Sequence, residues 1–206
     1  MQSIDRKKHW ENIYQTTNNN IFSWYQSTPT TSLEFINEMK ISRTSKIIDV
    51  GGGDSFFVDN LIELGFLDLT VLDISEAAIS RAKNRLGNNS SKVKWIVSDV
   101  TLFDEVEQYD FWHDRAVFHF LTEDEEIKKY SEIVSKKINA KGILVIGTFS
   151  DVGPKKCSGL EIKQYNELSL EKIFSSSFEK IKSLSVDHNT PSGKIQNFIF
   201  LSFRKK

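Results

Sequence analysis

Apolar residues along the chain gather in short runs that end in polar residues or glycine. Five such runs cover residues 46–50, 69–73, 93–97, 109–115 and 142–147. Short continuous apolar runs are typical of strands in a parallel sheet that is covered on both faces. Most of the segments between them space their apolar residues at i, i+3 and i+4, as amphipathic helices do. The alternation predicts an α/β fold with helices on both faces of the sheet.

Residues that cap helices mark several of the expected boundaries. Asp5 and Ser75 stand where an N-cap belongs, and Gly87 can stop the helix that Ser75 begins. The spacing Thr122-x-x-Glu125 is that of a capping box, which predicts a helix starting there. A long loop is expected from Ser150 to about Asn166, followed by a short helix that begins at Ser169.

The pattern changes to period two near the end of the chain. Leu184 and Val186, and later Phe198 and Phe200, alternate with polar or outward-facing residues. Between the two runs lies Pro191-Ser192-Gly193, a typical turn sequence. The chain therefore ends in an antiparallel hairpin that follows the βα units.

The segment before the first strand is rich in aromatic residues. Trp10, Ile13 and Tyr14 lie on one side of the helix that Asp5 begins, and Trp24 and Tyr25 follow. Two interpretations fit: an arm that covers a binding site, or a helix packed on the sheet with its aromatics as core. We expect one domain over residues 1–206, with residues 1–40 as the aromatic arm and residues 41–206 as the core.

The first strand leads directly into a glycine turn. Lys46–Val50 ends in Gly51-Gly52-Gly53, and a segment with helical spacing follows. Glycines let the backbone approach a ligand closely, and the helix start presents free N–H groups to the same place. Asp73 ends the second run, where a carboxylate can accept both hydroxyls of a ribose. The pattern predicts a nucleotide-like cofactor at this edge of the sheet.

Asp99 follows the third run, so acidic residues stand at three strand ends in order. In this arrangement the chain resembles the class I S-adenosylmethionine-dependent methyltransferases, over roughly residues 5–205. The resemblance implies a Rossmann-like, doubly wound seven-stranded sheet that is mostly parallel, with S-adenosyl-L-methionine as cofactor. It also implies that the aromatic arm folds over the cofactor and part of the acceptor, through Trp10, Tyr14, Trp24 and Tyr25.

The resemblance also assigns cofactor contacts. Asp49 matches the acidic residue before the glycine loop, Asp73 the ribose-binding acid, and Asp99 the acid that contacts the adenine amino group. Asp54-Ser55 departs from the family, because many members continue the loop with another glycine. The full set expected at the cofactor is Asp49, Gly51, Gly52, Gly53, Asp73, Ile74, Asp99, Val100 and Arg115.

The segment after the fourth strand supplies candidates for the chemistry. Asp114 or Arg115 is expected to meet the amino or carboxylate group of the methionine half. His119 has a side chain suited to removing a proton near neutral pH; alternatively, it is a helix-start residue bonded to backbone. His113 is expected to point into the sheet layer, and His9 and His188 to lie at the surface.

Cys157, the single cysteine, stands in a Gly/Pro/Ser loop and follows two lysines. Nearby cations lower the pKa of a thiol and favour the thiolate. One interpretation is that Cys157 faces the acceptor and takes part in the reaction. The other is a small buried hydrophobic residue.

Composition narrows the function classes. A net charge of −1 over 206 residues gives no electrostatic footprint for nucleic acid. The Asp/Asn-Pro-Pro-aromatic motif of nucleic-acid amino methyltransferases is also absent after the fourth strand, because Arg115-Ala116 follows Asp114. A single cysteine excludes an internal disulfide framework and a cysteine-rich zinc site. The sequence supports neither another metal site nor a Ser/His/Asp hydrolase triad. No apolar segment is long enough to span a bilayer, and a cytoplasmic location is expected.

The sequence thus predicts a methyltransferase acting on a small-molecule acceptor. One alternative is a protein-lysine methyltransferase of the same fold, because Asp114-Arg115-Ala116-Val117-Phe118 resembles the Asp-Lys-Gly-Thr-hydrophobic segment of such enzymes. The other is a cofactor-binding module without transferase activity. The sequence leaves the oligomeric state open.

Overall fold

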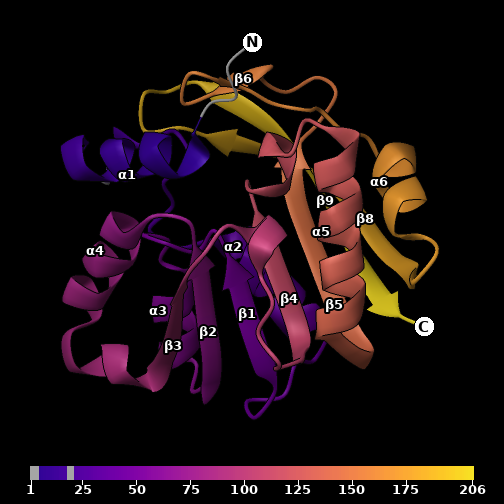
Figure 1. The fold of residues 1–206 in the computed structure, drawn as a ribbon, viewed down its shortest axis with the longest axis horizontal. Coiled ribbons are helices and arrows are strands. Elements are labelled where there is room, and N and C mark those ends of the chain that lie inside the picture. Colours follow the sequence, from indigo (N-terminus) through magenta and orange to yellow (C-terminus); the bar gives the residue numbers. More distant parts are fainter. Residues whose placement is uncertain (1–4, 18–20) are drawn as a thin grey trace.

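The computed structural model describes residues 5–17 and 21–206. Its main sheet has seven strands in the order β3-β2-β1-β4-β5-β9-β8 (Figure 1). Only β9 runs antiparallel to its neighbours, and the other pairings are parallel. The predicted Rossmann-like sheet with a C-terminal hairpin is confirmed. The strands are β1 (Lys46–Val50), β2 (Asp68–Asp73), β3 (Val93–Val97), β4 (Tyr109–Arg115), β5 (Ile138–Phe149), β8 (Phe178–Asn189) and β9 (Ile195–Lys205).

Helices cover both faces of this sheet because successive residues of each strand point to opposite sides. In β1, for example, Ile48 and Val50 pack with α5 and α6, whereas Ile47 packs with α2 and α3. Two hydrophobic clusters result, one on each face. The helices are α1 (Arg6–Thr16), α2 (Thr30–Glu38), α3 (Phe57–Glu63), α4 (Glu76–Leu86), α5 (Asp124–Lys137) and α6 (Glu167–Phe174), with short 3₁₀ turns η2 (Gly87–Lys92), η3 (Val100–Leu102) and η4 (Phe118–Phe120).

Three predicted helix boundaries are confirmed by their capping contacts. The carboxylate of Asp5 accepts a hydrogen bond from Lys8 N at 3.0 Å, and the Ser75 hydroxyl accepts one from Ala78 N at 3.1 Å. Gly87 ends α4 with φ at +55°, a conformation that glycine adopts without strain.

Two predicted helix starts are wrong. Helix α5 has Glu123 at its N-cap with no side-chain hydrogen bond, so Thr122 forms no capping box. Three acidic residues in its first turn, Asp124, Glu125 and Glu126, instead complement the helix dipole. Helix α6 starts earlier than expected because Asn166 caps it and Ser169 closes the capping box as its third residue.

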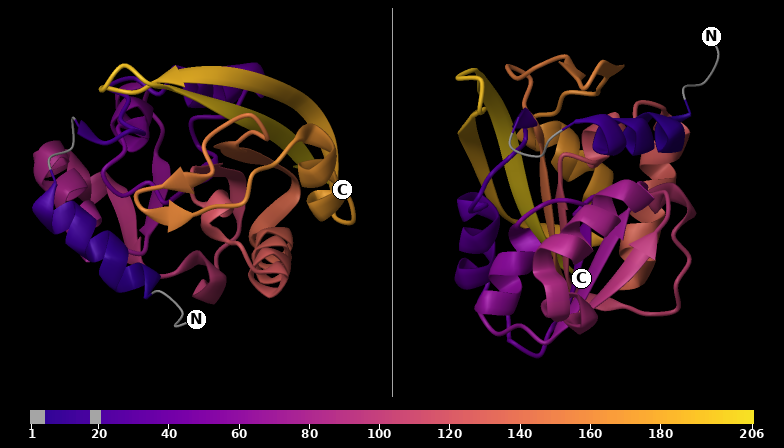
Figure 2. Two further views of the ribbon diagram at one scale, coloured as in Figure 1. Left: turned by 90° about the horizontal axis from the view of Figure 1, so that it is seen from above. Right: turned by 90° about the vertical axis from the view of Figure 1, so that its left-hand side faces the viewer.

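The long loop after β5 contains a two-stranded ribbon that the sequence did not predict. Its strands are β6 (Lys156–Cys157) and β7 (Leu160–Glu161), which pair in antiparallel fashion. Figure 2 shows this ribbon and α1 at the same end of the sheet. Both therefore lie where the parallel strands have their carboxyl ends, the edge at which α/β folds bind ligands.

The described part of the chain holds no helix long and apolar enough to cross a bilayer. It also holds no group of three or more His, Cys, Asp or Glu side chains arranged to bind a metal ion.

Candidate functional site

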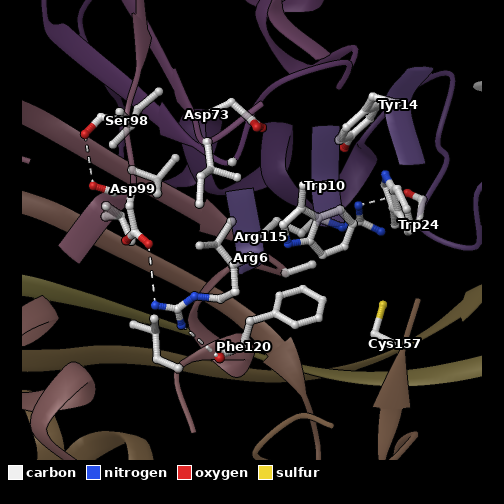
Figure 3. A pocket seen from close by; sticks show the side chains of 18 residues that line it. Arg6, Trp10, Tyr14, Trp24, Asp73, Ser98, Asp99, Arg115, Phe120 and Cys157 are labelled. Carbon is white, nitrogen blue, oxygen red and sulfur yellow. Dashed lines mark hydrogen bonds and ion pairs between the residues drawn. The ribbon is translucent and has the colours of Figure 1, made fainter. Parts of the chain in front are cut away.

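A cavity lies at the carboxyl ends of the parallel strands, between the strand loops and α1 (Figure 3). Its empty volume is about 770 Å³, counting the part open to solvent. The strand-end wall consists of Val50, Gly51, Leu72, Asp73, Ile74, Ser98, Asp99 and Val100. The opposite wall includes Arg6, Trp10, Tyr14, Trp24, Arg115, Phe120 and Cys157, and the remaining lining residues are Ala116, Val117 and Leu121.

The glycine turn forms part of the strand-end wall. Gly51 has φ at +67°, and a Cβ there would overlap the side chain of Val117. A Cβ on Gly52 would overlap the Asp49 carboxylate, and one on Gly53 would overlap that of Asp73. The turn thus lies directly against two carboxylates, and only glycine leaves room for them.

Asp73 is buried at the end of β2, with its Oδ1 accepting a hydrogen bond from Ser75 N at 2.8 Å. Burial raises its pKa to about 7, opposed by the backbone hydrogen bond from Ser75 and assisted by the charge of Asp49. Its other oxygen, Oδ2, lies beside Gly53. A ligand that donates hydroxyl hydrogens there would stabilise the ionised carboxylate.

Asp49 belongs to a buried chain of hydrogen bonds under the glycine turn. Its Oδ1 lies 2.7 Å from His113 Nδ1, and His113 Nε2 lies 2.8 Å from Ser32 Oγ on α2. The exposed fractions of Ser32, His113 and Asp49 are 1%, 2% and 3%. Asp49 Oδ2 has no hydrogen-bond partner within the described residues. The expectation that His113 points into the sheet layer is confirmed, and the chain ties α2 to the carboxylate below the turn.

Asp99 lines the cavity beyond Asp73. Its Oδ1 accepts hydrogen bonds of 2.8 Å from both the backbone N and the hydroxyl of Thr101, and its Oδ2 lies 3.4 Å from Arg6 Nη2. Arg6 also donates to Glu126 Oε2 at 3.2 Å and to the Phe120 carbonyl at 3.3 Å. The sequence did not predict that Arg6 and Glu126 belong to this site, because the two residues are 120 positions apart and only the fold brings them into contact.

The aromatic arm lies across the cavity. The Trp10 ring is 5.0 Å from Phe120 and 5.8 Å from Trp24, both with edge-on geometry. Tyr14 also packs against Ala78 of α4, so the arm both lines the cavity and forms a small core of its own. Tyr25 differs from expectation: it packs on Phe56, 5.8 Å away, and is not among the lining residues.

Polar contacts fix the arm in this position. Glu11 on α1 accepts hydrogen bonds from the Ser75 hydroxyl at 2.8 Å and from Ala77 N at 3.2 Å, at the N-terminus of α4. His188 Nε2 lies 2.7 Å from the Ser23 carbonyl. His188 is therefore buried, and the expectation of a surface residue was wrong because the arm packs over the β8–β9 hairpin.

Asp114 and His119 do not line the cavity, contrary to expectation. Asp114 is fully buried and accepts hydrogen bonds from the Tyr130 hydroxyl at 2.7 Å and from Val117 N at 3.0 Å; burial raises its pKa to about 6. It shapes the loop after β4. His119 is also fully buried and stacks on Phe149 with ring centres 4.6 Å apart.

The alternative for His119, a hydrogen bond to backbone, is not found either. Neither ring nitrogen has a partner within the part of the chain that is described. Burial, together with the nearby charge of Arg115, lowers the pKa of His119 to about 3. The ring is neutral at physiological pH and packs as an aromatic.

Cys157 lines the cavity from β6, but not as a thiolate. Burial raises its pKa to about 11, so the expected lowering by neighbouring lysines was wrong. Lys155 is exposed, and Lys156 pairs with Glu161 at 2.6 Å on the outer side of the ribbon. The thiol is protonated near neutral pH.

Comparison with known proteins places the chain among methyltransferases. A family model described as a methyltransferase domain matches residues 41–205. The eEF1A lysine and N-terminal methyltransferase of Bos taurus is 24% identical over 142 residues, which is 68% of this chain and 20% of that protein. The malonyl-[acyl-carrier protein] O-methyltransferase of Anoxybacillus flavithermus is 30% identical over 106 residues, 51% of this chain and 39% of that protein. The chain thus spans well under half the length of these two relatives.

A solved structure shares the fold over nearly the whole chain. The 1,6-didemethyltoxoflavin-N1-methyltransferase of Burkholderia thailandensis, with its substrate and S-adenosylhomocysteine bound, superposes with a TM-score of 0.77 at 15% identity. The match covers 98% of this chain and 87% of that one.

Proposed function

The chain belongs to the methyltransferase-domain family, and from that premise we propose that it methylates a small-molecule acceptor. It is an S-adenosylmethionine-dependent methyltransferase. The cofactor supplies a methyl group on a positively charged sulfur. The protein's task is to hold the acceptor in line with that methyl group and to exclude water.

The strand-end wall fits this cofactor. We propose that Asp73 holds the ribose hydroxyls, because its carboxylate lines the cavity beside the glycine turn, at the end of β2. Asp49, whose Oδ2 lacks a partner within the described residues, suits the cofactor's amino group. Asp99 suits the adenine amino group, with Ile74 and Val100 as apolar neighbours in the same wall.

The observation that carries the choice of acceptor is the charge of the opposite wall. It contains the guanidinium of Arg115, and the only carboxylates lining the cavity within the described residues are Asp73 and Asp99. A lysine ammonium entering beside Arg115 would be repelled. Trp10 and Phe120 close this end, which suits a compact molecule better than a protein segment. The similar structure from Burkholderia thailandensis holds bound 1,6-didemethyltoxoflavin, the compound for which that enzyme is named.

A protein-lysine acceptor is the second candidate. Its support is the sequence similarity to the eEF1A lysine and N-terminal methyltransferase and the segment Asp114–Phe118. In that segment, however, Asp114 is held inward by Tyr130, and of its charged residues only Arg115 lines the cavity. For location, we propose the cytoplasm: the single cysteine is free and buried, as suits a reducing compartment. We also propose that residues 1–40 act as the arm of a single domain.

Turnover with separated cell extracts tests this proposal. The full chain is incubated with S-adenosylmethionine and either the metabolite fraction or the macromolecular fraction of an extract, and S-adenosylhomocysteine is measured. We expect product with metabolites alone. Product only with macromolecules would favour the protein acceptor. Binding of S-adenosylhomocysteine by calorimetry without turnover on either fraction would favour a module without transferase activity.

A further inference from the structure

The end of the cavity beneath the arm is built from flat aromatic rings. Trp10 stands edge-on to both Trp24 and Phe120, and Tyr14 lies 6.3 Å from Trp10. These rings come from α1, the segment after it and η4, and they converge on one space (Figure 3). Aromatic walls favour planar apolar ligands through stacked and edge contacts.

Arg115 is the charged group at this end. Its Nη1 donates to the Trp24 carbonyl at 3.0 Å, and its guanidinium lies over the Phe198 ring at 5.2 Å. Its Nη2 is buried, yet has no hydrogen-bond acceptor within the described residues. A buried donor left without a partner is costly, and a ligand that supplies an acceptor removes that cost.

No ion pair joins Arg115 to a carboxylate in the part of the chain that the structure describes. Burial lowers its pKa to about 10, and the more distant charge of Asp49 opposes this shift. Arg6, the other cation in the cavity wall, is already paired with Glu126 and Asp99. Arg115 is thus a partly buried cation with one buried N–H donor that a ligand can satisfy.

Among the described residues, no side chain at this end is placed to remove a proton. Asp114 and His119 lie outside the cavity, and burial raises the pKa of both Tyr14 and Cys157, so these two are protonated. An acceptor that enters already ionised needs no base, because its oxygen carries the electron pair that attacks the methyl group.

We propose that Arg115 binds the ionised hydroxyl of a planar aromatic acceptor, a phenolate-type oxygen, packed between the arm aromatics. This rests on the proposed function. The acceptor oxygen forms a bond to the methyl carbon while the carbon–sulfur bond breaks and its electron pair goes to sulfur. Anion and sulfonium become a neutral ether and a neutral thioether, with no proton to transfer. Such loss of charge is favoured where water is excluded.

Binding of two matched probes tests the inference without turnover. 4-Nitrophenol, at a pH where it is ionised, and 4-nitrotoluene are titrated by calorimetry into the full chain saturated with S-adenosylhomocysteine. We expect the phenolate to bind at least about tenfold more tightly, as a charge-assisted hydrogen bond allows. Arg115→Gln should abolish this preference, and Arg115→Lys should keep part of it. Arg43→Gln is the control, since Arg43 also covers an aromatic ring, that of Phe66, away from the cavity.

Two results would overturn the inference. One is equal affinity of the wild-type protein for both probes, or no binding of the phenolate. The other is that Arg115→Gln loses affinity for S-adenosylhomocysteine but keeps it for 5′-methylthioadenosine, which lacks the amino-acid tail; Arg115 would then bind the cofactor's carboxylate. Turnover on the macromolecular fraction alone would instead refute the small-molecule acceptor. The outcomes therefore separate failure of this inference from failure of the proposed function.

Discussion

The two ends of the cavity are held together in different ways. At the strand ends, the two carboxylates that line the cavity bond to backbone two residues further along: Asp73 to Ser75 and Asp99 to Thr101. At the arm end, the contacts join distant residues: 64 positions separate Glu11 from Ser75, 91 separate Arg115 from Trp24, and 120 separate Arg6 from Glu126.

This difference has a thermodynamic consequence. Short-range contacts at strand ends form with the sheet itself and cost little additional entropy. The arm is held by a few partly exposed polar contacts and a small aromatic cluster, so it can open at a cost well below that of global unfolding. We expect the strand-end wall to govern cofactor affinity and the arm to govern the acceptor.

The largest effect should come from the glycine turn. Gly51→Ala places a Cβ into Val117 and forces a non-glycine residue to φ +67°. Strain and overlap should weaken S-adenosylhomocysteine binding by about a hundredfold or more, measured by calorimetry. Gly65→Ala is the matched control, because Gly65 has φ +83° but nothing within 4 Å of a Cβ. Equal losses in both variants would mean that backbone strain alone, and not the cavity wall, is responsible.

The next effect should come from Asp73. Because its pKa rises from 3.8 to about 7 on folding, the folded protein holds this proton more tightly than the unfolded chain. The contribution of Asp73 to the free energy of unfolding therefore falls as pH rises from about 4 to about 7, and it does not change further above pH about 7. Asp73→Asn should melt at a higher temperature than wild type at pH about 8 without ligand, and bind S-adenosylhomocysteine about tenfold or more weakly.

Thermal melts across this pH range check the effect on stability, and calorimetric titration checks the effect on S-adenosylhomocysteine binding. An Asp73→Asn variant that binds the cofactor product as tightly as wild type would remove Asp73 from the cofactor site. Unchanged pH dependence of melting would show that the carboxyl is already ionised in the folded protein.

A smaller effect is expected at the arm. Glu11→Gln removes the charge that α1 places at the N-terminus of α4, which should loosen arm docking by about 1 kcal/mol. Limited proteolysis within residues 5–17 should accelerate roughly fivefold, with cofactor affinity changed less than about twofold. Glu34→Gln, on an exposed position of α2, should leave cleavage unchanged. A large loss of cofactor affinity in Glu11→Gln would contradict the expectation that the strand-end wall governs cofactor affinity and the arm governs acceptor binding.

The smallest effect should come from Cys157→Ser. The protonated thiol is part of the cavity wall, and a hydroxyl fills nearly the same space, so turnover should stay within about threefold of wild type. Alkylation of Cys157 by iodoacetamide should be slow at neutral pH and speed up as pH approaches about 11. Rapid alkylation at neutral pH, or loss of turnover at unchanged melting temperature, would restore Cys157 as a reactive group.

The sequence pattern by itself predicted the strands, the C-terminal hairpin, the glycine turn and the carboxylates at the strand ends, whereas the seven-stranded sheet was implied by the family resemblance. Apolar periodicity sets strands and helices because each element must bury one face, and Ser75 and Gly87 act on backbone within a few residues. Asp73 and Asp99 follow from the same rule, since parallel strands bring their carboxyl ends to one edge.

Tertiary structure decided the arm end and the charge states. Trp24 beside Arg115, Arg6 beside Asp99, and Ser32 joined to Asp49 through His113 depend on how distant segments pack, which no local pattern encodes. Burial is likewise a property of the whole fold. It raised the pKa of Cys157 where the neighbouring lysines predicted the reverse, and it turned His119 from an expected base into a packed aromatic ring.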